Sequence, residues 1–345
     1  MKTYWREKHY TLFMVIMIHF FQISNGQNIE KKYYVNPVSN ITSIGDPFVL
    51  AYNGLYYMYC TSETSLRRGF YVWTSKDMVN WEKQGLALSN ESPGILGIDR
   101  FWAPEVIRFK GKFYMTYSAG DNDGILKLCL AVSDQPLGPF QNYQSPWYEH
   151  NLSHIDATIL IDGDKVYTYF VRDCSTNIIS SRSTSQIFVA QLSADLKAFV
   201  TKPKAVLTPD QAWEDINGTR LWNEGPSVLK HKGIYYMTYS ANGYNTHEYC
   251  VAYATADNPF GPWKKASENP ILKSNLAIGV SGPGHNSFAW SPDGSELFMI
   301  YHIHTFPDKP SGNRTVCIDR VQFKNGKMVV NGPTKSPQPY PKTNK

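Results

Sequence analysis

The chain has 345 residues, of which 42% are hydrophobic and 14% aromatic, so it can bury a large core in one big domain or two smaller ones. Its formal net charge is only +5 and no long run of Lys or Arg occurs, which argues against a nucleic-acid-binding protein. Beyond the N-terminal segment no apolar run is long enough to span a membrane, so we expect no membrane-embedded part in the mature chain.

The N-terminus has the pattern of a secretory signal peptide. Three basic residues precede the eleven-residue segment TLFMVIMIHFF, and the small residues Ser24 and Gly26 follow it. Eleven residues are too few for an ordinary membrane span, which disfavours the alternative of an uncleaved anchor. We therefore expect residues 1–26 to be removed and the protein to be secreted to the extracellular space.

The potential N-glycosylation sites agree with secretion. Five Asn residues stand in the Asn-X-Ser/Thr pattern: Asn40, Asn90, Asn151, Asn217 and Asn313. The five cysteines form no CxxC pair, and four of them lie in strand-like runs. We expect mostly buried free thiols with at most one or two disulfides, rather than a disulfide scaffold or a zinc site.

After residue 30 the chain repeats a short aromatic pattern, and helical periodicity is almost absent. GKFYMTYSA at residues 111–119 returns as GIYYMTYSA at residues 233–241, 122 positions later. Aromatic and β-branched runs bounded by turn residues predict β-strands. Three similar runs also follow turns rich in Gly and Asp: GLYYMYCTS from Gly54, KVYTYFVRD from Lys165 and ELFMIYHIH from Glu296.

The spacing of these runs predicts an all-β fold, a five-bladed β-propeller. Each of the first four runs is followed by a second strand-like run that ends in an Asp with an aromatic residue beyond it. Units of roughly 50–70 residues with about four strands each are typical of propeller blades. We expect one domain over residues 36–333 and a flexible Pro-rich tail over 334–345. The alternative, a β-sandwich, does not require five similar units.

Each unit opens with a residue that can carry chemistry. The first strands of propeller blades line a central channel, so these residues should converge at one mouth of it. Carboxyl groups brought so close are costly unless they are used. Cleavage of a glycosidic bond uses such a set, because one carboxylate activates water while a protonated carboxyl protonates the leaving oxygen. The five residues are Asp46 in GDPF, Trp102 in WAPE, Asp156 in IDA, Glu224 in EGP and His285 in GPGHNS.

The register of Glu224 is irregular. A shift of 122 residues superposes Trp102 on Glu224, and a shift of 110 superposes Asp46 on Asp156. Aligning GLYYM with GIYYM, a shift of 179, places Asp46 on Gly225 instead. A slip of one residue would turn the Glu224 side chain to the other face of its strand, and a glycine bulge at Gly225 is the expected correction.

These five motifs, in this order, resemble those of glycoside hydrolase family 43, and the resemblance covers nearly the whole chain after the signal segment. That family consists of five-bladed propeller enzymes that act on xylose- and arabinose-containing glycans with inversion. The resemblance implies that Asp46 is the general base and Glu224 the general acid. It also implies that Asp156 tunes the acid and orients the sugar.

The resemblance extends to residues that bind rather than react. Trp102 resembles the aromatic residue of the sugar pocket, and Arg314 resembles an arginine that reaches the sugar near the acid. His285 resembles a central histidine that, in many members, lies near a bound metal ion through water. No cofactor is expected to be required, and a structural or water-bridged calcium near His285 is the metal that the resemblance allows.

We therefore expect a secreted, monomeric, inverting glycosidase with a polysaccharide or oligosaccharide substrate. It would release xylose or arabinofuranose from plant-type glycans, as a β-xylosidase or an α-L-arabinofuranosidase. Two alternatives stay open. An endo-arabinanase on the same scaffold would have an open groove instead of a closed pocket, and a non-catalytic glycan-binding propeller would not need all three acids.

Overall fold

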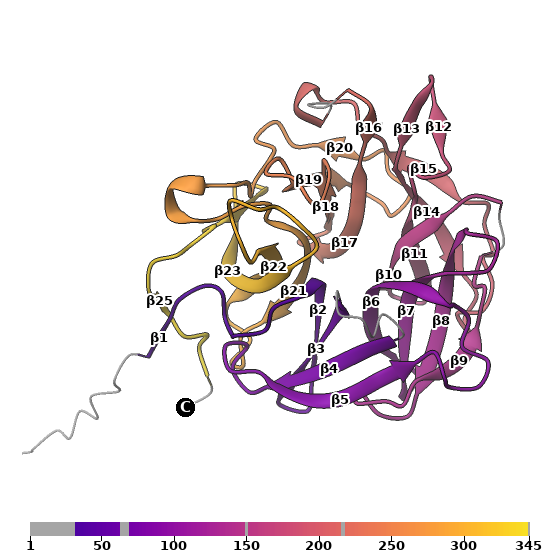
Figure 1. Ribbon diagram of the computed structural model, residues 1–345, viewed down its shortest axis with the longest axis horizontal. Coiled ribbons are helices and arrows are strands. Elements are labelled where there is room, and N and C mark those ends of the chain that lie inside the picture. The colour runs from indigo at the N-terminus through magenta and orange to yellow at the C-terminus, as the bar shows by residue number, and fades with distance from the viewer. Residues whose placement is uncertain (1–31, 63–68, 149–150, 215–217, 344–345) are drawn as a thin grey trace, which may run out of the picture. The chain divides into compact units, whose positions relative to one another are not determined.

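The computed structural model describes residues 32–62, 69–148, 151–214 and 218–343, drawn as the coloured ribbon in Figure 1. Residues 32–345 form one compact unit. The expected signal peptide, residues 1–26, and the potential glycosylation site at Asn217 lie outside the described residues. Apart from two 3-10 turns, the regular elements of the described part are β-strands, which confirms the all-β prediction.

Five antiparallel sheets of four strands make up most of the described part, and in each the strand order follows the chain. Sheet 1 consists of β2 (Ile44–Tyr52), β3 (Leu55–Ser62), β4 (Gly69–Ser75) and β5 (Glu82–Ser89). Sheet 2 consists of β6 (Asp99–Phe109), β7 (Lys112–Gly120), β8 (Leu126–Ser133) and β9 (Gln141–Gln144). Sheet 3 consists of β10 (His154–Asp162), β11 (Lys165–Arg172), β14 (Gln186–Leu192) and β15 (Lys204–Leu207). Sheet 4 consists of β17 (Asn223–His231), β18 (Ile234–Ala241), β19 (Cys250–Ala256) and β20 (Lys264–Lys265). Sheet 5 consists of β21 (Gly284–Trp290), β22 (Leu297–His304), β23 (Arg314–Lys324) and β24 (Lys327–Val330).

Smaller elements complete the described ranges. The 3-10 turns are η1 (Ala212–Glu214) and η2 (Leu276–Ile278). A three-stranded sheet consists of β12 (Ile178–Ile179), β13 (Arg182–Thr184) and β16 (Arg220–Leu221). None of the helical segments in these ranges has the length or the apolar character that crossing a membrane requires.

The C-terminal segment is joined to the start of the described chain. Strand β25 (Gln338–Pro339) pairs with β1 (Tyr33–Tyr34). Thr334 donates its hydroxyl hydrogen to Asp319 on β23 at 2.6 Å, and Arg320 donates to the carbonyl of Pro339 at 2.9 Å. The segment expected to be a flexible tail therefore has partners on sheet 5 over its described part.

The repeated aromatic runs are the second strands of the five sheets. In β3, Tyr56 and Met58 enter one cluster of buried side chains, while the alternate residues Tyr57 and Tyr59 enter another. The two faces of a strand point in opposite directions, so a strand covered on both faces needs large apolar or aromatic residues at every position. This double burial explains why nearly the same nine residues occur twice in the chain.

Five clusters of buried side chains lie between successive sheets. They join sheet 1 to 2, 2 to 3, 3 to 4, 4 to 5, and sheet 5 back to sheet 1. The last of these places Ile44 of β2 in one core with Ile300 of β22 and Val316 of β23. In Figure 1 the first strands, such as β2, β10 and β17, face a common centre, while β5 and β9 lie outside.

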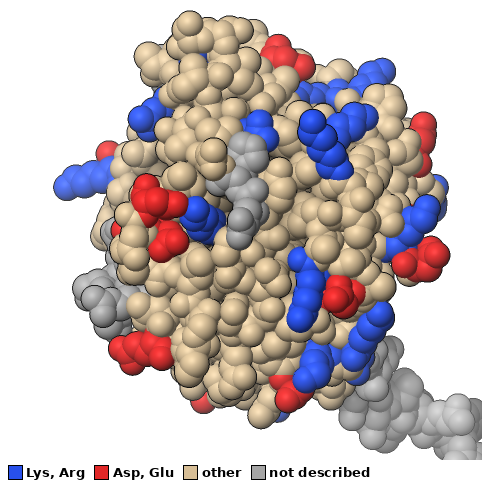
Figure 2. Space-filling model, turned by 90° about the vertical axis from the view of Figure 1, so that its right-hand side faces the viewer, with Lys and Arg blue, Asp and Glu red and all other residues tan. Residues whose placement is uncertain are grey.

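Charged side chains of both signs are mixed on one face of the molecule (Figure 2). On the face shown in Figure 2, Lys and Arg side chains lie singly or in small groups, and Asp and Glu side chains lie among them. All five cysteines are buried free thiols, as the sequence predicts for most of them.

Candidate active site

The first strand of each sheet carries the same backbone irregularity. A register shift interrupts its pairing with the second strand in all five sheets. At that bulge one residue has a left-handed φ between 46° and 56°. Such a conformation is costly for every residue except glycine, and it concentrates at functional sites. The five residues are Asp46, Ala103, Asp156, Gly225 and His285.

The shared bulge explains the irregular register of Glu224. Gly225 has the left-handed position that Asp46 and Asp156 have in their own sheets, so Glu224 precedes that position by one residue. Trp102 is its counterpart in sheet 2, because Trp102 pairs with Ser118 as Glu224 pairs with Ser240. The one-residue offset and the glycine bulge are therefore confirmed.

The backbone N–H groups at four of these bulges bond to the second strand of the preceding sheet. A hydroxyl group accepts in three cases and an imidazole nitrogen in the fourth. This pattern ties sheet 1 to sheet 2, 2 to 3, 4 to 5, and 5 to 1. The pairs are Ala103 N to Thr61 Oγ1 at 2.8 Å, Asp156 N to Ser118 Oγ at 3.1 Å, His285 N to Ser240 Oγ at 2.7 Å and Asp46 N to His302 Nδ1 at 3.1 Å.

The link from sheet 3 to sheet 4 departs from this pattern, and the departure involves Asp156. The residue of β11 at the hydroxyl position is Val171, which pairs with Ile155 and has no acceptor in its side chain. The N–H of Gly225 donates instead to Oδ2 of Asp156 at 3.1 Å. The carboxyl group of Asp156 thus takes the place of a hydroxyl and is tied directly to the residue after Glu224.

Two glycines of the motifs make room for side chains of the site. A Cβ atom on Gly45, in GDPF, would lie 2.0 Å from Cζ of Arg314. A Cβ atom on Gly284, in GPGH, would lie 2.0 Å from a ring carbon of Tyr249. Any larger residue at either position would displace a side chain that contacts one of the acids.

Asp46 is surrounded by nitrogen atoms. Its Oδ1 lies 2.8 Å from Nη1 of Arg314, 3.3 Å from Nδ1 of His285 and 3.6 Å from Nδ1 of His302. Burial raises the pKa of Asp46, but the charge of Arg314, followed by that of His285, outweighs burial and brings the pKa below its ordinary value. Burial lowers the pKa of His302 well below its ordinary value, so His302 is a neutral acceptor of the Asp46 N–H rather than an ion-pair partner. Asp46 is therefore ionised.

Glu224 is shifted in the opposite direction. Burial raises the pKa of Glu224 to about 8; the hydrogen bond from Tyr249 opposes this rise, and the charges of Asp173 and Asp46 add to it. Burial also raises the pKa of Asp156 to about 7, and the charge of Glu224 adds to that rise. Glu224 is thus mostly protonated near neutral pH, whereas Asp46 is ionised. Acid–base cleavage needs two carboxyl groups in these opposite states.

Three residues around the acids were not predicted from the sequence. The hydroxyl of Tyr249 donates to Oε1 of Glu224 at 2.8 Å, and its ring stacks on that of His302 with centroids 5.6 Å apart. Asp173 lies close enough to Glu224 to raise its pKa. Asp173 ends the repeated run KVYTYFVRD, and His302 lies two residues before the end of the run ELFMIYHIH. Membership of these runs is the one signal in the sequence that could have pointed to them. Tyr249 lies in the loop before β19 and carried none.

Contacts join five of the six predicted site residues into two groups, one around Asp46 and one around Glu224. Arg314 and His285 contact Asp46 directly, and Asp156 contacts the backbone beside Glu224. Arg314 contacts the expected base, Asp46, and its charge also lowers the pKa of Glu224. Trp102 is partly buried against the cluster between sheets 3 and 4, one residue before the bulge of sheet 2.

The surroundings of His285 do not form a direct calcium site. Calcium takes six to eight oxygen ligands. Across the described ranges, no three His, Cys, Asp or Glu side chains are grouped so that they could hold a metal ion. Nδ1 of the His285 ring faces Asp46 instead, and the backbone N–H of His285 donates to Ser240.

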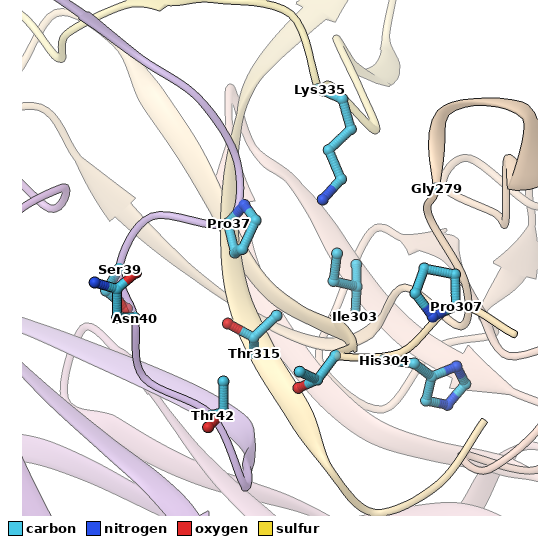
Figure 3. A pocket seen from close by; sticks show the side chains of 11 residues that line it. Pro37, Ser39, Asn40, Thr42, Gly279, Ile303, His304, Pro307, Thr315 and Lys335 are labelled. Carbon is cyan, nitrogen blue, oxygen red and sulfur yellow. The ribbon is translucent and has the colours of Figure 1, made fainter. Parts of the chain in front are cut away.

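A separate cavity of about 290 Å³ lies beside the site, and Figure 3 shows Thr315, His304 and Lys335 among its lining residues. None of the six predicted site residues lines it. His304 links it to the site, because its Nε2 donates to the carbonyl of Tyr244 at 2.8 Å and the Tyr244 ring lies 5.1 Å from the Arg314 guanidinium carbon. The cavity therefore neighbours the acids without containing them.

Comparison with known proteins identifies the family. Residues 34–328, spanning all five sheets, match the glycosyl hydrolases family 43. The chain belongs to this family. A crystal structure of a thermostable family-43 glycoside hydrolase shares 53% sequence identity with a TM-score of 0.88, and the match covers 90% of this chain and 100% of that one. Family 43 enzymes are inverting glycoside hydrolases, so the protein is one too, and its substrates are polysaccharides or oligosaccharides.

The names of relatives within family 43 refer to different sugars. The structure of an endo-1,4-β-xylanase from Bacteroides thetaiotaomicron shares 35% identity with a TM-score of 0.75, over 89% of this chain and 99% of that one. A β-D-galactofuranosidase of Aspergillus niger is 28% identical, over 83% of this chain and 81% of that protein. Other relatives bear the names of arabinofuranosidases, xylosidases and an endo-arabinanase.

Proposed function

We propose that the protein releases xylose or L-arabinofuranose from plant-type glycans, as a β-xylosidase or an α-L-arabinofuranosidase. Relatives with these names, and the xylanase structure with 35% identity, support this choice of sugars. The galactofuranosidase relative makes D-galactofuranose the competing sugar. An endo-acting arabinanase is the second candidate, and one relative bears that name.

The proposed architecture is a single five-bladed β-propeller over residues 36–333. Two observations support it: the buried clusters that join the five four-stranded sheets in a cycle, and the hydrogen bonds between sheets at the bulges. In this arrangement the bulges would lie around one mouth of the axis, where a sugar would bind.

In the proposed mechanism Asp46 is the general base and Glu224 the general acid. The protonated carboxyl of Glu224 gives its proton to the glycosidic oxygen while Asp46 takes a proton from the attacking water. Asp156 accepts the hydrogen bond from the N–H of Gly225 and so keeps the neighbouring residue Glu224 in its position on β17. Arg314, beside Asp46, and Trp102 are the proposed sugar-binding residues. The observation that carries this assignment is the opposite direction of the pKa shifts of Asp46 and Glu224.

The test combines a substrate panel with stereochemistry. Aryl glycosides of xylose, arabinofuranose and galactofuranose would be compared by kcat/KM, and linear arabinan would be digested to separate exo from endo action. NMR of the first-formed sugar of the best substrate should give the inverted anomer. A retained anomer would contradict Asp46 as a base, since a retaining enzyme uses that carboxylate as a nucleophile.

Secretion, removal of residues 1–26, glycosylation and a monomeric state are further parts of the proposal. Asn40 and Asn151 are exposed and so suited to carry glycans. Asn313 is less suited, because its Oδ1 accepts from Ser43 N at 3.0 Å and from Thr305 Oγ1 at 2.9 Å. Expression in a eukaryotic secretory host, followed by N-terminal sequencing, deglycosylation with mass measurement and sedimentation analysis, tests all four statements.

A further inference from the structure

The hydroxyl of Tyr249 has a fixed direction. Tyr249 is fully buried, and both burial and the charge of Glu224 raise its pKa well above the ordinary value, so the phenol keeps its hydrogen. Ser240 Oγ accepts the N–H of His285 at 2.7 Å and is also hydrogen-bonded to Tyr249. The hydroxyl of Ser240 donates to the phenol oxygen, so the phenol hydrogen points to Oε1 of Glu224, 2.8 Å away.

This direction decides which oxygen of the acid carries the proton. In a neutral carboxyl group one oxygen is a pure acceptor and the other bears the hydrogen. Oε1 of Glu224 accepts from Tyr249, so the hydrogen is favoured on Oε2. We propose that Tyr249 is a positioning residue that keeps the transferable proton of Glu224 on Oε2, the oxygen that would face the leaving group. This inference rests on the proposed role of Glu224 as general acid.

The ring of Tyr249 is held as firmly as its hydroxyl. It stacks on the His302 ring with an interplanar angle of 3°, and the absence of a side chain on Gly284 gives it space. The loop that carries it is anchored by His247, whose Nδ1 lies 2.8 Å from Ser281 Oγ and whose carbonyl accepts from Ser274. The phenol therefore has little freedom to leave Glu224.

Several charged groups on other elements act on Glu224, and the pH–rate profile of the enzyme reflects all of them. The charges of Asp46, Asp173 and Arg314 shift the pKa of Glu224. Asp156 and Cys174 also interact electrostatically with Glu224. The ring of His285 lies beside Gly225, the next residue in the chain. The hydrogen bond from Tyr249 lowers the pKa of Glu224. Removing only the hydroxyl should leave the other groups in place and raise that pKa.

The experiment compares Tyr249→Phe with Tyr301→Phe. Tyr301 is the matched control, because it is also fully buried and donates to a carboxylate, Asp319, at 2.7 Å, but Asp319 does not act on Glu224. With a xylo- or arabino-oligosaccharide, Tyr249→Phe should lower kcat about tenfold, a part of the 10²–10⁴-fold that general acid catalysis supplies. With activated nitrophenyl glycosides it should change kcat by less than about threefold. The basic limb of the pH–rate profile should move to higher pH.

Tyr301→Phe should change neither the dependence on the leaving group nor the pH profile. If Tyr249→Phe behaves like Tyr301→Phe, the positioning role is wrong. Glu224→Gln is run beside them: if it shows no greater loss with poor leaving groups, the proposed acid is wrong, whatever Tyr249 does. Should Tyr249→Phe fail to fold, Ser240→Ala is measured instead. It removes the donor to the phenol oxygen and so weakens the phenol as a donor to Glu224. It must show the same selective loss in smaller measure, and an unselective loss would overturn the inference.

Discussion

Nη1 of Arg314 lies 2.8 Å from Oδ1 of Asp46, although 268 positions separate the two residues in the chain. The contact joins β23 of the last sheet to β2 of the first, so it exists only because sheet 5 packs against sheet 1. Arg314 is almost fully buried, and its guanidinium fits against Gly45, the residue before Asp46. The charge that keeps Asp46 ionised is therefore supplied by the closure of the fold.

Replacing Arg314 with Met should move the whole pH–rate profile to higher pH. Arg314 lowers the pKa of Asp46 and also that of Glu224. Without it, Asp46 would need a higher pH to ionise, and Glu224 would keep its proton to a higher pH. Both limbs of the pH profile of kcat/KM should therefore move to higher pH. Arg314→Lys keeps a positive charge and should move them less. Arg320→Met, which removes an arginine paired with Glu296 instead, should shift neither limb.

Replacing Asp173 with Asn should move only the basic limb, and in the opposite direction. The negative charge of Asp173 raises the pKa of Glu224, so its loss lets Glu224 ionise at lower pH and the acid-competent form is lost earlier. The pH dependence of kcat/KM with an oligosaccharide measures this. Asp162→Asn is the control, since Asp162 pairs with Lys230 and does not act on Glu224. A basic limb that stays in place in Asp173→Asn would contradict the role of this charge.

A hydroxyl group at position 171 should replace Asp156 as the hydrogen-bond acceptor of the Gly225 N–H. In Asp156→Ala the buried N–H of Gly225 loses its acceptor, which costs about 1–3 kcal/mol of unfolding free energy. Val171→Thr places a hydroxyl where three of the other four sheets have Thr61, Ser118 and Ser240. In the Asp156→Ala background Val171→Thr should raise the unfolding free energy by about 1 kcal/mol. In the wild-type background it should not raise it.

Denaturant unfolding of the four proteins in this cycle gives the coupling between positions 156 and 171. Activity should stay low in Asp156→Ala/Val171→Thr, because a hydroxyl does not carry the charge of a carboxylate. Equal effects of Val171→Thr in both backgrounds would mean that the acceptor position is not shared.

Removal of divalent metal ions should leave activity unchanged. The residues around His285 offer no direct calcium site, and the proton transfers assigned to Asp46 and Glu224 need no metal. The protein is dialysed against EDTA and assayed with and without added Ca²⁺, and its thermal unfolding is followed in both buffers. A loss of kcat that Ca²⁺ restores would show that a water-bridged ion near His285 takes part. A change in melting temperature alone would indicate a structural ion.

The sequence by itself determined the all-β class, the five units and the five motif residues. This was possible because burial on both faces leaves a local trace: a second strand between two sheets, such as β3 or β18, must be large and apolar or aromatic along its length. The shifts of 110 and 122 residues also matched Asp46 with Asp156 and Trp102 with Glu224, as the bulges do.

Only the tertiary structure decided what surrounds the acids. Tyr249, Asp173 and His302 lie on three different sheets or their loops. The repeated runs contain Asp173 and His302, but no local pattern shows that a side chain becomes important through a neighbour far away in the chain. The same holds for the pairing of β1 with β25 and for the substitution of Asp156 for a hydroxyl that Val171 lacks. Periodicity records how a strand is covered, whereas the protonation states of Asp46 and Glu224 depend on charges and donors from several sheets that meet only when the sheets pack together.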